Sequence, residues 1–128
     1  MCSSDLAAAA CDCAVGQIVK SLIFRGRTTG TPLLLLVSGA NRVDEKAVAA
    51  TLGEALKRTD ADDVRAITGY AVGGVPPLGH ATPLATWIDA DLLAHDRVWA
   101  AAGTPHAVFS VAPRTLAEAT GARILHVK

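Results

Sequence analysis

The chain has 128 residues, of which 51% are hydrophobic and 19% charged, a balance that predicts one globular domain with a core of its own. Its twelve basic and twelve acidic side chains cancel, so a polyanion such as nucleic acid could be held only by a local basic patch. No apolar run approaches the roughly twenty residues of a membrane span and no export signal opens the chain, which predicts a cytoplasmic protein without membrane partners.

The first part of the chain predicts a helix and two strands. Residues 3–14 are rich in alanine and open with the candidate caps Ser3, Ser4 and Asp5, which indicates a short helix that Gly16 ends. Residues 17–26 and 32–39 are apolar runs separated by "RTTGT", the pattern of two strands joined by a tight connection. We expect these two strands to pair in antiparallel fashion.

The remaining elements predict a mixed fold. Asp44 is the expected N-cap of a helix over 45–58, and a second short helix follows from Thr59 or Asp60 to about Gly69. A later helix begins at Pro113 and ends at Gly121. Strands are expected at 84–89, 97–102, 106–111 and 123–128. Because strands outnumber β-α-β units, we predict an α+β fold with a mixed, mainly antiparallel curved sheet or partial barrel and peripheral helices.

The cysteines and histidines do not predict a metal site. Cys2, Cys11 and Cys13 are an odd number without a CxxC pair, which is typical of free thiols in a reducing compartment. Cys11-Asp12-Cys13 could supply half of a metal site, but no second thiol pair follows and the four histidines are not at ligand spacing. We therefore expect no metal and no other cofactor.

The segment "GYAVGGVPPLGHATPL", residues 69–84, contains four glycines and three prolines. No GK[ST] follows it and no GxGxxG opens a helix, so it is neither a Walker loop nor a dinucleotide fingerprint. Composition alone favours a structured turn over a ligand loop. A rigid loop with unpaired backbone N–H groups can also bind a carbonyl or phosphate oxygen, so both interpretations stay open.

Lys20 interrupts an apolar strand. Successive side chains of a strand point to alternate faces, so Lys20 is expected on the same face as Leu22, with Ile23 on the other face. It is either a lysine that snorkels at a sheet edge or a cation in a cleft, where Arg25 and Arg27 would complete a local basic patch.

Other catalytic arrangements find no support in the residues. There is no GxSxG, and the cysteines do not lie at a strand-to-helix turn. Asp89, Asp91 and Asp96 are interpreted as caps and turn formers rather than acid/base residues. A second glycine-proline loop, "GTPHAVF" at 103–109, leads into an apolar strand. The residues alone thus predict two rigid loops and one unusual lysine, without a conventional catalytic set.

The chain resembles the YbaK/EbsC family, which is related to the editing domain inserted in bacterial prolyl-tRNA synthetases. The resemblance runs from about residue 7 to the C-terminus through "QIVKSLIF", "LLLLVSGANRVDEKAVAATLG", "ITGYAVGGVPPLGH" and "WIDADLLAHDRVWAAAGTPHAVFSVAP". It implies a YbaK-like fold and hydrolysis of the ester bond of mischarged tRNA. Lys20, in its K[ST]L context, matches the family's essential lysine. The family's two substrate loops match Gly69, Tyr70, Gly73, Gly74, Val75, Pro76, Gly79, Gly103, Thr104 and Pro105, with His106 as a neighbour.

The resemblance also implies a mechanism without a protein nucleophile. An aminoacyl ester is already activated, so Lys20 would anchor the tRNA terminus while backbone N–H groups near Gly73 and Gly74 polarise the carbonyl and the substrate helps to orient water. The expected partner is the 3′ aminoacyl end of tRNA, with an aminoacyl-tRNA synthetase as a further candidate. The alternative is a non-catalytic module that binds tRNA or a synthetase. Relatives usually begin one helix and one strand earlier, so we expect residues 1–128 to form a single editing domain and leave N-terminal truncation open.

Overall fold

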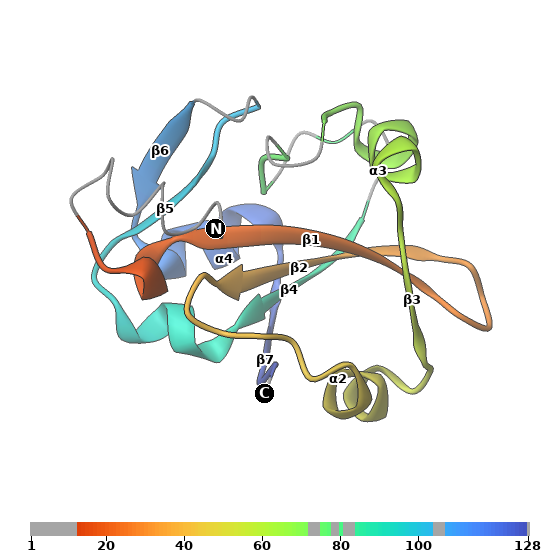
Figure 1. The fold of residues 1–128 in the computed structure, drawn as a ribbon. Helices are drawn as coiled ribbons and strands as arrows, with labels where there is room; N and C mark the ends of the chain where they lie inside the picture. The colour runs from red at the N-terminus through yellow and green to blue at the C-terminus, as the bar shows by residue number, and fades with distance from the viewer. Residues whose placement is uncertain (1–12, 72–74, 78–79, 81–83, 104–106, 128) are drawn as a thin grey trace.

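The computed structural model describes residues 13–71, 75–77, 80, 84–103 and 107–127 (Figure 1). The elements in chain order are η1 (Val15–Gln17), β1 (Val19–Gly26), β2 (Pro32–Ser38), α2 (Glu45–Leu52), β3 (Leu56–Arg58), α3 (Ala61–Thr68), β4 (Ala85–Asp89), η2 (Ala90–Ala94), β5 (Val98–Ala101), β6 (Val108–Val111), α4 (Pro113–Thr120) and β7 (Arg123–Leu125), where η marks a 3₁₀ helix.

The described strands form two sheets. Five strands make one sheet in the order β3-β1-β2-β4-β7, and β5 pairs with β6 in a second sheet. The pairs β1–β2, β1–β3 and β5–β6 are antiparallel, whereas β2–β4 and β4–β7 are parallel. The predicted mixed α+β fold, with a mainly antiparallel sheet and peripheral helices, is confirmed.

The central strand β2 is buried on both faces. Residues 33–37 are each at most 7% exposed, which explains a continuous apolar run where a half-exposed strand would alternate. Leu34 and Leu36 pack into one cluster with residues of α3 and α4. Leu33, Leu35 and Val37 pack into a second cluster with Val48 of α2. Figure 1 shows α2 and α3 on opposite sides of the sheet. The two faces of β1 and β2 therefore meet different helices.

The helix predicted over 45–58 is too long. Asp44 caps α2 as expected, because its carboxylate accepts hydrogen bonds from the backbone N–H groups of Lys46 and Ala47. The helix ends at Gly53, whose φ of +86° is left-handed. Leu56–Arg58 then forms β3 against β1. Val48, Leu52 and Leu56 keep a helical spacing past Gly53, and this pattern concealed β3 in the sequence.

The other element predictions agree with the described structure apart from their ends. Asp60 caps α3 and Gly69 ends it, while Pro113 and Gly121 bound α4. The last strand ends at Leu125. Nearly all of the helix predicted at 3–14 lies outside the described residues. None of the described helices is long and apolar enough to cross a bilayer.

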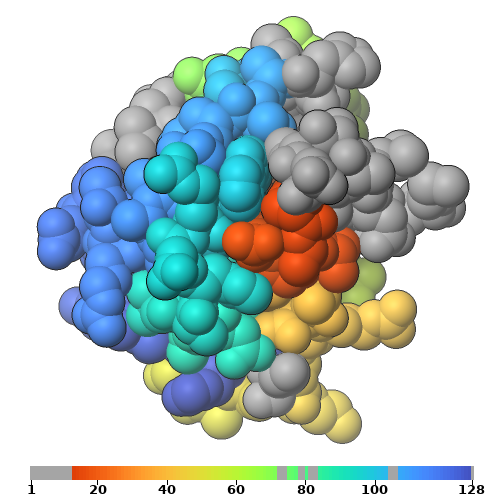
Figure 2. Space-filling model, turned by 90° about the vertical axis from the view of Figure 1, so that its left-hand side faces the viewer, coloured from red at the N-terminus to blue at the C-terminus, as the bar shows by residue number. Residues whose placement is uncertain are grey.

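The first described residues form hydrogen bonds with two other segments of the chain. The Gln17 amide donates to the carbonyl of Arg97 (3.1 Å), and the Ser38 hydroxyl donates to the carbonyl of Gly16 (2.8 Å). Figure 2 shows this end of the molecule, where the first described residues (red) fill the space between the β4–β5 segment (cyan) and the segment after β2 (gold). These bonds hold the residues before β1 against the end of β2 and the segment before β5.

Candidate functional site

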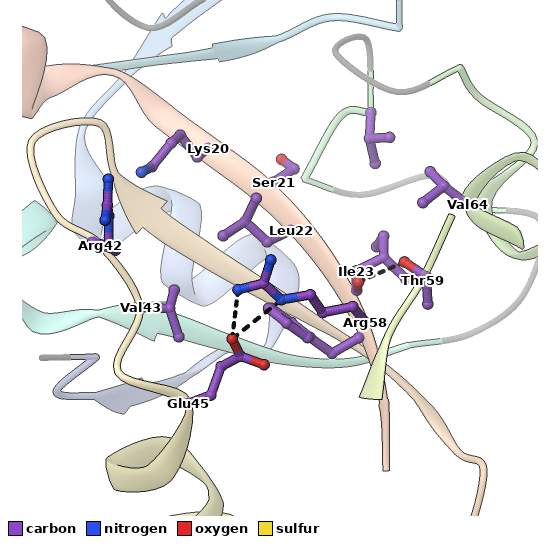
Figure 3. A pocket seen from close by; sticks show the side chains of 12 residues that line it. Lys20, Ser21, Leu22, Ile23, Arg42, Val43, Glu45, Arg58, Thr59 and Val64 are labelled. Carbon is purple, nitrogen blue, oxygen red and sulfur yellow. Dashed lines mark hydrogen bonds and ion pairs between the residues drawn. The ribbon is translucent and has the colours of Figure 1, made fainter. Parts of the chain in front are cut away.

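A cleft of about 360 Å³ opens beside β1 (Figure 3). Its walls come from β1, the segment after β2, the start of α2, β3 with the residue after it, α3, and the glycine-rich segment 69–84. The lining residues are Lys20, Ser21, Leu22, Ile23, Phe24, Arg42, Val43, Glu45, Arg58, Thr59, Val64 and Val75.

The cleft lies where one edge of β1 is left open. β3 pairs with β1 only from Phe24 to Gly26, and Ile18 bridges to Trp99 near the other end. Between these points, residues 20–22 have no strand partner on that edge within the described chain. An open edge presents backbone N–H and C=O groups, so this gap can contact a ligand through the main chain as well as through side chains.

Lys20 lines the cleft from β1, and its side chain extends toward the segment after β2 (Figure 3). The strand register sets Lys20 opposite Val37, on the face of Leu22 as predicted. The side chain is half-buried, and its Nζ donates to the carbonyl oxygen of Asn41 at 2.5 Å. No carboxylate of the described residues forms an ion pair with it. An ammonium has three N–H donors, so this arrangement leaves donors that can bind an anionic or carbonyl oxygen.

Asn41 is held in turn by two carboxylates, a feature that sequence reasoning missed. Its amide nitrogen donates to Asp89 Oδ2 and Asp91 Oδ2, both at 2.8 Å. Asp89 caps η2 as predicted, but its Oδ2 also accepts from the backbone N–H of Ser38 at 3.1 Å. The only sequence signal was a polar residue at the end of a buried strand. Asp96, the third predicted cap or turn residue, is exposed in the turn before β5.

The predicted basic patch of Lys20, Arg25 and Arg27 is wrong. Arg25 lies on the opposite face of β1 and forms a two-pronged ion pair with Asp63 of α3, with N–O distances of 2.8 and 3.0 Å. The hydrogen bonds of this pair raise the pKa of Arg25 and lower that of Asp63. Arg27 is exposed and does not line the cleft. An odd spacing from Lys20 along the strand already places Arg25 on the other face, and Arg27 lies in the turn after β1 ends.

The cations that do line the cleft with Lys20 are Arg42 and Arg58. Arg42 follows Asn41 directly and is exposed. Arg58 lies in β3 and pairs with Glu45 at 2.8 Å, and the hydrogen bond between them raises the Arg58 pKa. Figure 3 shows Lys20 and Arg42 together at one end of the cleft. Arg58 was missed because its strand was predicted as helix.

The two glycine-containing loops meet at Tyr70. Gly69 ends α3 with a φ of +82°, and the backbone N–H of Tyr70 donates to the Thr68 hydroxyl at 3.0 Å. A Cβ built on Gly103 would lie 3.4 Å from the Tyr70 ring. The structure therefore brings these predicted substrate contacts together, although neither glycine lines the cleft.

The glycine-proline segment reaches the cleft at Val75, which is 3% exposed and lines the wall. The carbonyl oxygen of Pro76 lies 2.6 Å from His80 Nε2, which fixes this part of the segment. The other predicted site residues, Gly73, Gly74, Gly79, Thr104, Pro105 and His106, lie outside the described residues. The described residues contain no group of three His, Cys, Asp or Glu side chains placed to hold a metal ion.

Comparison with known proteins identifies the family of this chain. The family model "Aminoacyl-tRNA editing domain" matches residues 3–119. The chain is 30% identical to the uncharacterized protein YwhH of Bacillus subtilis (strain 168), over 81% of this chain and 66% of YwhH. It is 25% identical to the "Putative Cys-tRNA(Pro)/Cys-tRNA(Cys) deacylase EbsC" of Enterococcus faecalis (strain ATCC 700802 / V583), over 88% of this chain and 68% of EbsC.

A solved structure gives the same answer. It is described as "a putative trans-editing enzyme for prolyl tRNA synthetase", and it matches with a TM-score of 0.92 and 46% identity over 98% of this chain and 79% of the other. The family model covers most of the sequence, and this fold agreement extends to nearly all of it. The chain belongs to the aminoacyl-tRNA editing domain family.

Proposed function

We propose that this protein hydrolyses the ester bond between a wrongly attached amino acid and the 3′ end of its tRNA, acting in trans on released aminoacyl-tRNA. The observation that carries this proposal is the Lys20 ammonium, held by Asn41 at the open edge of β1 and facing a cleft of about 360 Å³. Family membership and the names of the relatives support the same chemistry.

The cleft has a charged wall and an apolar wall, which suit the tRNA terminus and the amino-acid side chain of such a substrate. Lys20 and Arg42 provide positive charge for the phosphate and carbonyl oxygens of the tRNA terminus. Val43, Val64 and Val75 provide an apolar wall for the side chain of the amino acid.

The reaction needs positioning more than a nucleophile. Water adds to the ester carbonyl carbon, and the tetrahedral intermediate then breaks its bond to the ribose oxygen, which takes up a proton as the free amino acid leaves. Lys20 would hold the terminus in place, and the backbone N–H groups of Gly73 and Gly74, matched through the family resemblance, would stabilise the negative oxygen. A group of the substrate itself would orient the water.

The competing proposal is a non-catalytic module that binds tRNA or a synthetase. Incubating the protein with tRNA charged with alanine, cysteine, serine or proline, and following loss of the ester above its spontaneous rate, separates the two. We expect hydrolysis of at least one mischarged tRNA, and its loss in Lys20→Ala with the fold retained. Binding without hydrolysis in the wild type would favour the module. Wild-type turnover in Lys20→Ala would remove Lys20 from the site.

A further inference from the structure

A buried carboxylate, Asp89, lies behind the lysine of the cleft and takes no part in the steps above. It is 2% exposed. Its Oδ2 accepts from Ser38 N–H and the Asn41 amide, and its Oδ1 accepts from Asp91 N–H. Burying a carboxylate is costly unless such bonds are made. Capping the short helix η2 uses only the Asp91 bond, so the other two hold the end of β2 and the segment after it.

Asn41 is the residue that this carboxylate holds. Both hydrogens of its amide are used, one on Asp89 and one on Asp91. A flipped amide would turn its oxygen toward two carboxylates, so only one orientation fits. Asn41 is itself 7% exposed. Its backbone carbonyl, the acceptor for Lys20, is therefore fixed from the side of β4.

We propose that Asp89 and Asn41 are positioning residues that hold the Lys20 ammonium in place before substrate binds. The contacts run from a buried carboxylate through an amide and a carbonyl to the ammonium. A lysine has a flexible four-carbon stem, and anchoring it in the free protein removes an ordering cost from substrate binding. Arg42 follows Asn41 directly, so the same anchor places the second cation. The effect on turnover rests on the proposed function, whereas the anchoring itself does not.

The test uses three variants of the full chain. Asn41→Ala keeps the carbonyl but removes both amide bonds, and Asp91→Ala removes the acceptor of one of them. Ser38→Ala is the matched control, because it removes the hydroxyl that donates to the Gly16 carbonyl and accepts from the Ala40 N–H, and it leaves the Asn41 amide and its two carboxylates in place. Circular dichroism establishes that each variant is folded at the assay temperature.

The first measurement needs no substrate. Each variant is treated with a limiting amine-acetylating reagent, and mass spectrometry gives the labelling rate of Lys20 relative to the exposed Lys46 and Lys57. We expect Lys20 labelling to rise severalfold in Asn41→Ala, less in Asp91→Ala, and not at all in Ser38→Ala. The second measurement is kcat/KM for deacylation, which we expect to fall about tenfold in Asn41→Ala and to stay at the wild-type value in Ser38→Ala.

Unchanged Lys20 labelling in folded Asn41→Ala overturns the proposal, whatever happens to activity. Raised labelling with wild-type kcat/KM also overturns it, because the anchor would then not serve the reaction. If Asn41→Ala does not fold, Asp91→Ala decides by the same criteria. If the wild type hydrolyses no mischarged tRNA, the proposed function fails, and the labelling series still decides whether Lys20 is anchored.

Discussion

Gly103 lies directly against the ring of Tyr70: a Cβ built on Gly103 would come within 3.4 Å of the Tyr70 Cε1 atom. Gly103 also has a φ of +104°, a conformation that L-residues rarely adopt. This contact joins the end of the α3 segment to the loop after β5. A side chain at 103 would therefore disturb two loops at once.

Gly103→Ala should lower both stability and deacylation. The positive φ alone costs about 1–2 kcal/mol, and the added methyl group would lie against the Tyr70 ring. The control is Gly121→Ala, which has a φ of +66° but no described atom near the added Cβ. It should lose comparable stability and keep its kcat/KM. Thermal unfolding and single-turnover deacylation on both variants check this, and equal activity losses would show that Gly103 matters only for folding.

Arg42→Ala should weaken tRNA binding and make the salt dependence of the binding constant shallower. Arg42 lines the cleft and is exposed, so it can neutralise a phosphate whose counterions are then released. Arg25→Ala is the control, because Arg25 lies on the other face in its pair with Asp63. Titration of labelled tRNA at several salt concentrations measures both. A larger effect of Arg25→Ala would place the tRNA on the opposite face of the sheet.

Val64→Ala should broaden the range of amino acids that are removed. Val64 is 7% exposed and forms part of the apolar wall of the cleft. A smaller side chain at this position therefore leaves more room in the cleft for the side chain of the amino acid. The loss of buried methyl groups should destabilise the fold by about 2 kcal/mol. Val48→Ala removes the same group from the other cluster, which does not line the cleft. It should cost similar stability without changing the ratio of kcat/KM values for alanyl- and larger aminoacyl-tRNAs.

Glu54→Gln should reduce stability at neutral pH but not in acid. The Glu54 carboxylate accepts hydrogen bonds from the backbone N–H groups of Thr28 and Thr29 and from the Thr29 hydroxyl. These bonds, led by the Thr29 backbone, lower the pKa of Glu54 below its ordinary value of 4.5. A lowered pKa contributes stability above the ordinary value and loses it as pH falls through the folded-state pKa. Urea unfolding of both proteins at pH 7 and pH 3 should therefore show a difference that disappears in acid.

Local signals predicted most of the fold. Asp44, Asp60 and Pro113 mark helix starts and Gly69 and Gly121 mark helix ends, because caps depend on neighbouring residues alone. β3 was missed because Leu56 continued a helical spacing. Only its pairing with β1, a contact distant in sequence, makes that segment a strand.

The candidate site was predictable only in part. Lys20 was noticeable because a cation interrupts an apolar strand, and its face followed from alternation. Its anchor was not predictable, since Asn41 and Asp89 meet through the parallel pairing of β2 with β4. The prediction that Lys20, Arg25 and Arg27 form a basic patch was wrong for a related reason, because residues close in sequence were assumed to be close in space. Arg42 and Arg58 reach the cleft from other segments.

That parallel pairing also bears on when the site can form as the chain is made. The hairpin of β1 and β2 is local and can close early, but the bond from Asn41 to Asp89 joins residues 48 apart. During synthesis Lys20 would leave the ribosome well before the carboxylate that indirectly anchors it. A nascent chain stopped before β4 would already carry the lysine, and the site would gain its fixed geometry only after β4 joined the sheet.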